Sequence, residues 1–317
     1  MARTGSSGFA LLTIDGYDLL PAKVQAFAYK IGVKQEKTDG LGDRWEEHTP
    51  TGLRAVTITQ TGAYFDTAAN GIHEALRAAP SSYRTLTFSP AAGLLISAAG
   101  ALTVNYEVLA KNGNLTRANV GYQISGAVSS GALVQAPSSR TADWNTQAEG
   151  AAIDYTTDPS QSPMAIIGIT AGNPAVITTA APHGLTAGAV ILISGSNSTP
   201  SANGERPVTV TGAYTFTIPL TTTGAGTAGS FVRANSVSGA RGIQHVIALA
   251  GLTGFVGKVR DSADNVVYAD LVTFANVTAA PNSQSLDVAG VVDRYLSFDG
   301  NVTGTGSIAV GAGLVRL

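Results

Sequence analysis

The chain has 317 residues, no cysteine and a formal net charge of −2, and its charged fraction of 13% is about half of the ~25% usual in soluble domains. The lack of cysteine excludes disulfides and thiolate metal sites, and the near-neutral balance excludes a simple electrostatic grip on nucleic acid or an acidic membrane. The 37 glycines, together with abundant Thr, Ser, Val and Ala and few aromatics, favour many short strands joined by turns, so we expect a mainly β fold.

The first predicted elements form a long hairpin. The pattern predicts a strand over residues 23–33 and then a half-buried strand in which Val56 and Ile58 alternate with Thr57 and Thr59. Between the two strands lies a loop dense in charges of both signs. Its charged residues are Lys34, Glu36, Lys37, Asp39, Asp43, Arg44, Glu46, Glu47 and Arg54. Mixed charges set register and partner choice, so we expect this loop to meet another protein surface.

Trp45 lies in the middle of this charged loop. A tryptophan is costly to expose, so Trp45 is either an anchor in a small satellite core or a hot spot of an interface. We favour the interface because so polar a loop offers little local core.

One short helix is predicted, over residues 67–77, with Asp66 or Thr67 as its cap and Pro80 as its end. Strands are then expected at residues 83–88, 102–109 and 115–128, the last two joined by a turn at 111–114. These elements complete a first β domain, residues 1–135.

The rest of the chain divides into three further parts. Residues 132–141, which contain Pro137, read as a linker, and residues 136–164 are predicted to hold this linker and the first strand of a C-terminal domain. Residues 165–233 are predicted to form an inserted small β module. Residues 234–317 show the strand-and-turn rhythm expected of a C-terminal sandwich or barrel.

The inserted module is almost free of charge. Between residues 166 and 232 the only charged residues are Glu205 and Arg206. Closely spaced β-rich runs separated by Gly, Pro and Asn turns predict a unit that folds without its flanks. We therefore expect it to project from the outer surface of the protein.

The sequence offers few groups for catalysis. His48, His73, His183 and His245 have four different contexts, and no nucleophile motif accompanies them. The acidic residues around His48 could bind a hard cation, but their spacing matches no known metal loop, and a solvated or interfacial loop is the simpler interpretation. The Gly-x-Gly-x-x-Gly string at 224–229 precedes a predicted strand and not a helix, which favours a turn over a nucleotide site. No catalytic, cofactor or metal site is predicted.

A stretch from Asn173 to Gly188, containing Pro182-His183-Gly184, is followed by Val190 to Gly195, by Asn203-Gly204 and by Tyr214 to Thr217. It resembles a small β module frequent in tailed-phage virion proteins, which is similar to the first catalytic-cysteine half-domain of ubiquitin-activating enzymes. Without any cysteine in the chain, this resemblance implies a fold and no activity.

The flanking segments resemble siphophage major tail proteins, the subunits of the tail tube. The segments that carry the resemblance are residues 112–128, 261–274 and 292–296. The resemblance implies a mainly β tail-tube-type sandwich or barrel, and a structural virion protein that polymerises into stacked rings around a conduit for DNA. It implies no enzyme activity, no cofactor and no membrane. The alternative is a carbohydrate- or receptor-binding tail module, because β-sandwiches with exposed aromatics also bind glycans.

The implied partners are further copies of the same chain, in trimeric or hexameric rings stacked helically, other tail proteins, and DNA that passes transiently through the lumen. The implied location is the virion, after assembly in the host cytoplasm. In this setting the charged loop, Lys34 to Arg54 with Trp45, is predicted to contact the neighbouring ring.

Two segments share an order of features. Tyr106 is followed by Gly113-Asn-Leu-Thr116, and Tyr295 by Gly300-Asn-Val-Thr303. The match fits either an internal duplication, which would give each chain two tube-type domains and allow a trimeric ring, or a coincidence in a Gly/Thr-rich chain.

Overall fold

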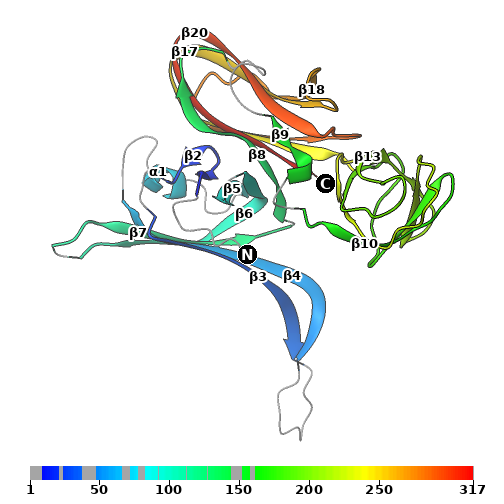
Figure 1. Cartoon of the computed structure of the whole chain (residues 1–317). Helices are drawn as coiled ribbons and strands as arrows, with labels where there is room; N and C mark the ends of the chain where they lie inside the picture. The colour runs from blue at the N-terminus through cyan, green and yellow to red at the C-terminus, as the bar shows by residue number, and fades with distance from the viewer. Residues whose placement is uncertain are drawn as a thin grey trace, which may run out of the picture.

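The computed structural model describes residues 9–20, 24–37, 48–65, 72–77, 83–91, 93–111, 113–126, 128–143, 152–157 and 161–316. These residues form an almost entirely β protein, as predicted (Figure 1). Within them the one α-helix is α1 (Ile72–Arg77), the last part of the predicted helix. Residues 66–71, where the cap was expected, lie outside the described part.

The N-terminal half is one continuous set of antiparallel strands. They are β1 (Leu11–Ile14), β2 (Tyr17–Asp18), β3 (Ala26–Lys37), β4 (His48–Tyr64), β5 (Arg84–Ala91), β6 (Leu94–Leu109) and β7 (Arg117–Ile124). The order β3-β4-β7-β6 gives a four-stranded sheet, and the first half of β6 continues into β5, β1 and β2. Ile58 and Tyr122 lie on its inner face, where Leu86 and Phe88 of β5 cover them. The alternation read from Val56 to Thr59 is confirmed.

The predicted linker at 132–141 is wrong, because these residues continue strand β8 (Val128–Arg140). β8 pairs with β6 at its start and with β20 (Tyr295–Arg316) along most of its length, so one sheet runs across the boundary predicted at residue 135. Pro137 is tolerated because it lies where the β8–β20 register shifts, between the pairs of Gln135 and Ser138. The division into four domains stays a prediction.

Two very long strands dominate the C-terminal part. β17 (Ala240–Ser262) and β20 pair antiparallel from Ala240↔Arg316 to Ser262↔Tyr295. The strand-and-turn rhythm predicted for residues 234–317 does not extend to these two strands, because each of them is continuous. The glycines mark bulges inside continuous strands: the register shifts twice between Ala250 and Gly254, and a Cβ on Gly306 would overlap the carbonyl oxygen of Ala250.

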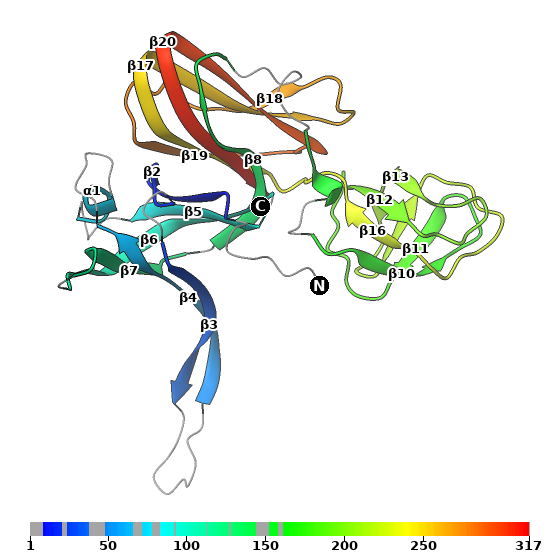
Figure 2. The ribbon, with the colours of Figure 1, turned by 60° about the vertical axis from the view of Figure 1, so that its left-hand side comes forward.

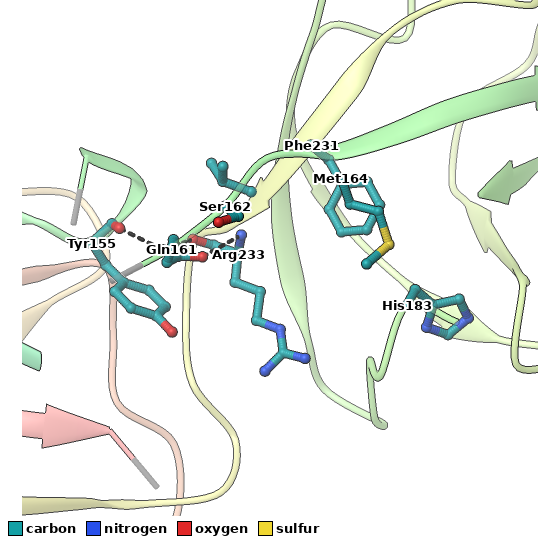
Figure 3. A pocket seen from close by; sticks show the side chains of 8 residues that line it. Tyr155, Gln161, Ser162, Met164, His183, Phe231 and Arg233 are labelled. Carbon is teal, nitrogen blue, oxygen red and sulfur yellow. Dashed lines mark hydrogen bonds between the residues drawn. The ribbon is translucent and has the colours of Figure 1, made fainter. Parts of the chain in front are cut away.

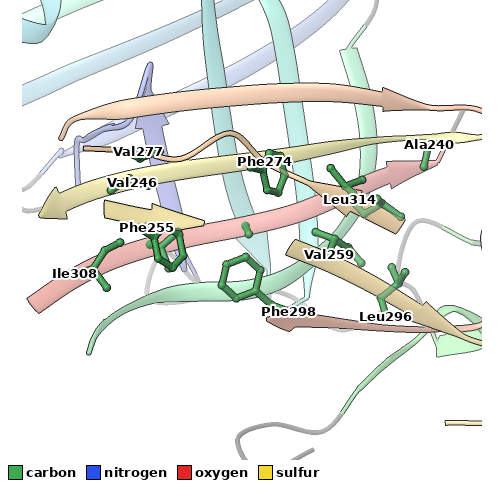
Figure 4. Close-up of a cluster of buried hydrophobic side chains, with 14 of the residues drawn as sticks. Ala240, Val246, Phe255, Val259, Phe274, Val277, Leu296, Phe298, Ile308 and Leu314 are labelled. Atoms are coloured by element: carbon green, nitrogen blue, oxygen red, sulfur yellow. The ribbon is translucent and has the colours of Figure 1, made fainter. Parts of the chain in front are cut away.

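This long hairpin bends over its own core. A Cβ on Gly257 would overlap the side chain of Gln244, so two distant parts of β17 face each other. Phe255, Phe274 and Phe298 fill the space between these layers, and the centroids of Phe255 and Phe298 lie 6.4 Å apart (Figure 4). Further strands pair with the edges of the hairpin: β9 (Ile153–Asp154), β18 (Ala269–Thr273) and β19 (Asn282–Val288).

The two segments behind the duplication hypothesis have different structures. Gly113 to Thr116 belongs to the turn between β6 and β7, whereas Gly300 to Thr303 lies inside β20. Their shared order of features therefore does not reflect a shared local fold.

Residues 164–233 form a separate seven-stranded sheet that lies beside the main body (Figure 2). Its strands are β10 (Met164–Ile169), β11 (Ala175–Thr179), β12 (Val190–Ser194), β13 (Gly204–Pro207), β14 (Thr209–Val210), β15 (Thr215–Ile218) and β16 (Ser230–Arg233). β13 and β14 stand at opposite ends of the strand order, yet only Val208 separates them in the chain. The sheet must therefore roll up, and it encloses its own core around Phe216 and Phe231.

Candidate assembly surface

The predicted contact loop is shorter than the sequence suggested. Lys34, Glu36 and Lys37 belong to β3 and Arg54 belongs to β4, which pair as far as Lys37↔His48. The other predicted interface residues, Asp39, Asp43, Arg44, Trp45, Glu46 and Glu47, lie outside the described residues. The reason for the difference is that strand pairing continues through the charged sequence.

The β3–β4 hairpin extends beyond the rest of its sheet. The last β4 residue paired with β7 is Val56, so residues 32–37 and 48–55 form a two-stranded projection, here named the arm (Figure 1). At the base of the arm Ile31 and Val33 are 56% and 52% exposed. Exposed apolar residues next to charged ones are a composition typical of a protein contact.

The four-stranded sheet has two open edges. Among the described residues β3 pairs with β4 alone, and β6 beyond Ala101 pairs with β7 alone. Each edge therefore presents backbone N–H and C=O groups that a neighbouring strand could pair with. Because the four strands alternate in direction, β3 and β6 run opposite ways, and the β3 edge of one copy could meet the β6 edge of another in antiparallel pairing.

The outer face of this sheet carries mainly polar side chains and few charges, with Leu102 and Leu109 on the same face. Residues paired across strands share a face, which places these side chains together: Thr57, Thr59, Thr61, Asn105, Asn119 and Gln123. The charged residues on the same face are Lys30, Glu107 and Arg117. Such a surface offers hydrogen bonds without a strong field of either sign.

A hollow of about 260 Å³ marks the junction between the small module and the main body (Figure 3). The Gln161 amide occupies its middle: its nitrogen donates to the carbonyl oxygens of Tyr155 and Arg233, and its oxygen accepts from the Arg233 N–H. Tyr155, in turn, stacks under the Arg316 guanidinium at 3.6 Å. The described lining residues include no carboxylate, so they provide no acid–base pair.

Arg294 ties the module to the body. Its guanidinium donates to both oxygens of Asp154 at 2.9 and 2.7 Å, and to Glu205 of the module at 2.9 Å. Burial alone would raise the pKa of Asp154, but hydrogen bonds from Arg294 and Thr156 outweigh it and hold the pKa below its usual value. Sequence reasoning missed this contact, although the scarcity of charge in the module was a signal: Glu205 is one of only two charged residues between positions 166 and 232, and it reaches the body.

His183 has a structural role. Its Nδ1 accepts from the Leu185 N–H at 3.0 Å, its Nε2–H donates to the Gly212 carbonyl at 2.8 Å, and its ring packs edge-on against Phe216. Gly184 follows with a φ of 59°, which forms the tight turn expected of Pro-His-Gly. The Gly-rich string at 224–229 leads into strand β16 and not into a helix, as the sequence predicted.

His245 is buried at the contact between the two halves of the protein. It is 0% exposed, and neither ring nitrogen has a hydrogen-bond partner among the described residues. Burial lowers its pKa to about 4, although the nearby Asp15 carboxylate acts in the opposite direction. Close by, Gly16 meets the backbone of Asn282, which packs the β1–β2 turn on β19.

The histidines do not converge. His73 shares a hydrogen bond of 2.7 Å with Tyr106 through Nδ1, whereas His183 lies in the small module and His245 lies in β17. His48 is the first residue of strand β4. Within the described ranges, no group of three or more His, Asp or Glu side chains is placed to hold a metal ion. No helix in the same part of the chain is long and apolar enough to cross a bilayer.

The exposed aromatic rings do not gather into a platform. In the described residues, the exposed large aromatics are Tyr83, which precedes β5, and Tyr214, which lies in the small module. They belong to different sheets, so the geometry gives no shared glycan surface.

Comparisons with known proteins find no matching family model and no matching curated protein. Several solved structures align with the chain. Three of them are the tail of an empty gene transfer agent particle (14% identity over 33% of this chain and 80% of that chain, TM-score 0.27), the virion of a native gene transfer agent particle (16%, 40% and 97%, TM-score 0.29), and the SPP1 Dit protein of the hub adsorption apparatus of Gram-positive-infecting phages (11%, 96% and 98%, TM-score 0.26). All three TM-scores lie below 0.5, so these likenesses carry no argument about function.

Proposed function

We propose that this chain is a structural subunit of a phage tail tube, located in the virion, whose copies join side by side into rings around a conduit for DNA. The observation that carries the proposal is the four-stranded sheet, whose β3 and β6 edges have no further strand paired to them among the described residues. Head-to-tail pairing of these edges would satisfy both at once and leave no edge free in a closed ring. The resemblance of residues 261–274 to tail proteins supports the same conclusion.

The number of copies follows from the width of the conduit. Strands about 4.8 Å apart and tilted by about 40° close a barrel about 48 Å across with twenty-four strands, and about 24 Å across with twelve. Inward side chains take about 5 Å from each wall, half of the spacing between packed sheets. Since duplex DNA is about 20 Å wide, only the larger barrel passes it. Four strands from each chain therefore favour six copies over three.

The outer face of the four-stranded sheet is the surface we assign to the lumen. Threonine and amide side chains with few charges would not trap the phosphate backbone, whereas a basic wall would bind it in a salt-dependent way. The inner face cannot serve, because it is covered by the apolar core around Leu86 and Phe88.

Electron microscopy of the purified full-length protein tests this proposal. We expect hollow tubes, and in a cryo-electron microscopy reconstruction six chains per ring, with residues 26–37 of one chain paired to residues 103–109 of the next. A protein that stays monomeric at high concentration and binds a sugar would instead support the receptor-binding alternative. Rings closed by another sheet would contradict the assignment of the edges.

A further inference from the structure

The end of the four-stranded sheet opposite the arm carries a second hollow, of about 530 Å³. It lies where β3 begins, β4 ends and the β6–β7 turn projects. Leu109 and Leu115 line it and are 47% and 67% exposed, an unusual degree for two leucines at one turn. Lys111 and Arg117 line the same hollow, which makes it both apolar and cationic.

Two hydrogen bonds lie close to these cations. The Arg117 Nη1 donates to the Gly62 carbonyl at 2.7 Å, which fixes the guanidinium at the rim. The acidic residue next along β6 is Glu107, and its carboxylate accepts a long hydrogen bond of 3.4 Å from Asn119. Of the residues that the structure describes, those that line the hollow include no carboxylate.

The connector of the arm has the complementary composition. Residues 38–47 read Thr-Asp-Gly-Leu-Gly-Asp-Arg-Trp-Glu-Glu, with four acids, one base and two large apolar residues, Leu41 and Trp45. These residues join Lys37 to His48, so they leave the sheet at the end away from the hollow. A segment that is acidic and apolar thus stands at one end of the sheet, and a hollow that is cationic and apolar at the other.

We propose that the hollow formed by Leu109, Lys111, Leu115 and Arg117 receives the connector, residues 38–47, of a second copy of this chain. The contact cannot form within one chain, because the strand from Ala26 to Lys37 separates the two ends by about 36 Å. Since donor and acceptor are different surfaces, the contact is head-to-tail and repeats along the strand direction without closing. The inference rests on the proposed function, in which it joins successive rings.

The absence of native cysteine allows a direct test by crosslinking. In the full-length chain, Arg44→Cys and Asn114→Cys place one thiol on the connector and one beside the hollow, and leave the acids, Trp45 and both leucines in place. A short bis-maleimide should then give a ladder of dimers, trimers and higher multimers on a denaturing gel. Each single-cysteine variant should stop at dimers. The matched control pairs Arg44→Cys with Val266→Cys, which is 63% exposed on another turn, and should give no ladder.

The outcomes separate this contact from the tube itself. Tubes in the electron microscope without a ladder would overturn the docking of the connector and leave the tube standing. A ladder without tubes would support the docking and contradict the tube. Neither tubes nor a ladder would overturn both.

A charge-reversal pair adds a second readout. These changes are made in the chain that carries Arg44→Cys and Asn114→Cys. Lys111→Glu alone and Glu47→Lys alone should each lose the crosslinked ladder at low salt, because each change places like charges in contact. An equimolar mixture of the two variants should recover it, since the reversed connector of one fits the reversed hollow of the other. Failure of the mixture to recover a ladder that both variants had lost would contradict direct pairing.

Discussion

At the scale of single residues, we expect His245 to make the stability of this protein depend on pH. The ring is fully buried without a hydrogen-bond partner in the described structure, and its pKa falls from an ordinary value near 6.5 to about 4. The unfolded chain therefore binds a proton that the folded chain rejects. The free energy of unfolding should decline by roughly 3 kcal/mol as the pH falls from about 6.5 to 4, and it should recover when the pH is raised again.

Urea unfolding measured at intervals from pH 4 to pH 7 checks this prediction. His245→Leu removes the titrating group, so the slope between pH 4 and 6.5 should flatten. Gln244→Leu removes the neighbouring buried amide, which does not titrate, and should keep the slope. An unchanged slope in His245→Leu would show that another group causes the dependence.

At the scale of elements, the long β17–β20 hairpin depends on glycine at its bulges. A side chain at Gly306 would overlap the carbonyl of Ala250, and backbone atoms cannot yield as a flexible side chain does. We expect Gly306→Ala to lower the free energy of unfolding by about 1–3 kcal/mol, as overpacking does in a dense core.

Gly32→Ala is the matched control, because the nearest atom to its Cβ would be the Ala55 carbonyl oxygen at 3.9 Å. It should change stability little. Thermal unfolding followed by circular dichroism compares the two variants. Equal melting temperatures would mean that the bulge accommodates a Cβ at position 306, against the prediction.

At the scale of the whole molecule, the small module should be dispensable for the tube. β10 and β16 pair at Met164↔Phe231, so the two ends of the module leave the body side by side. Deletion of residues 164–233, with a short Gly-Ser linker, should leave a folded body that forms tubes of the same diameter. Electron microscopy measures this, and a soluble, folded variant without tubes would assign the module a part in assembly.

The link between Arg294 and Glu205 gives a milder test at the same scale. Glu205→Arg should leave tube assembly intact but loosen the module, because it replaces an ion pair by repulsion. In averaged cryo-electron microscopy images the density of the module should weaken relative to the wall. Undiminished density would mean that Gln161 and its partners hold the module without this pair.

Much of the fold could be predicted from local sequence, since strands leave a period of two and turns leave Gly, Pro and Asn. The alternation from Val56 to Thr59, the strands of the small module and the structural turn at His183-Gly184 followed from such patterns. The errors arose where a proline or glycine, residues typical of turns, lies inside a continuous strand. Pro137 lies at a register shift and Gly306 at a bulge, and a single sequence does not distinguish a bulge from a turn.

The sequence by itself determined the mainly β class, because composition and alternation are local properties. That the charged hairpin contacts another surface stays a prediction. Only the tertiary structure decided that β3 and β6 are open edges of one sheet, and that a cationic, apolar hollow lies at the end away from the arm. It likewise decided that Glu205 reaches Arg294. The edges, faces and ends of a sheet are set by pairing between residues far apart in the chain. Such pairing cannot be read from the sequence of either strand alone.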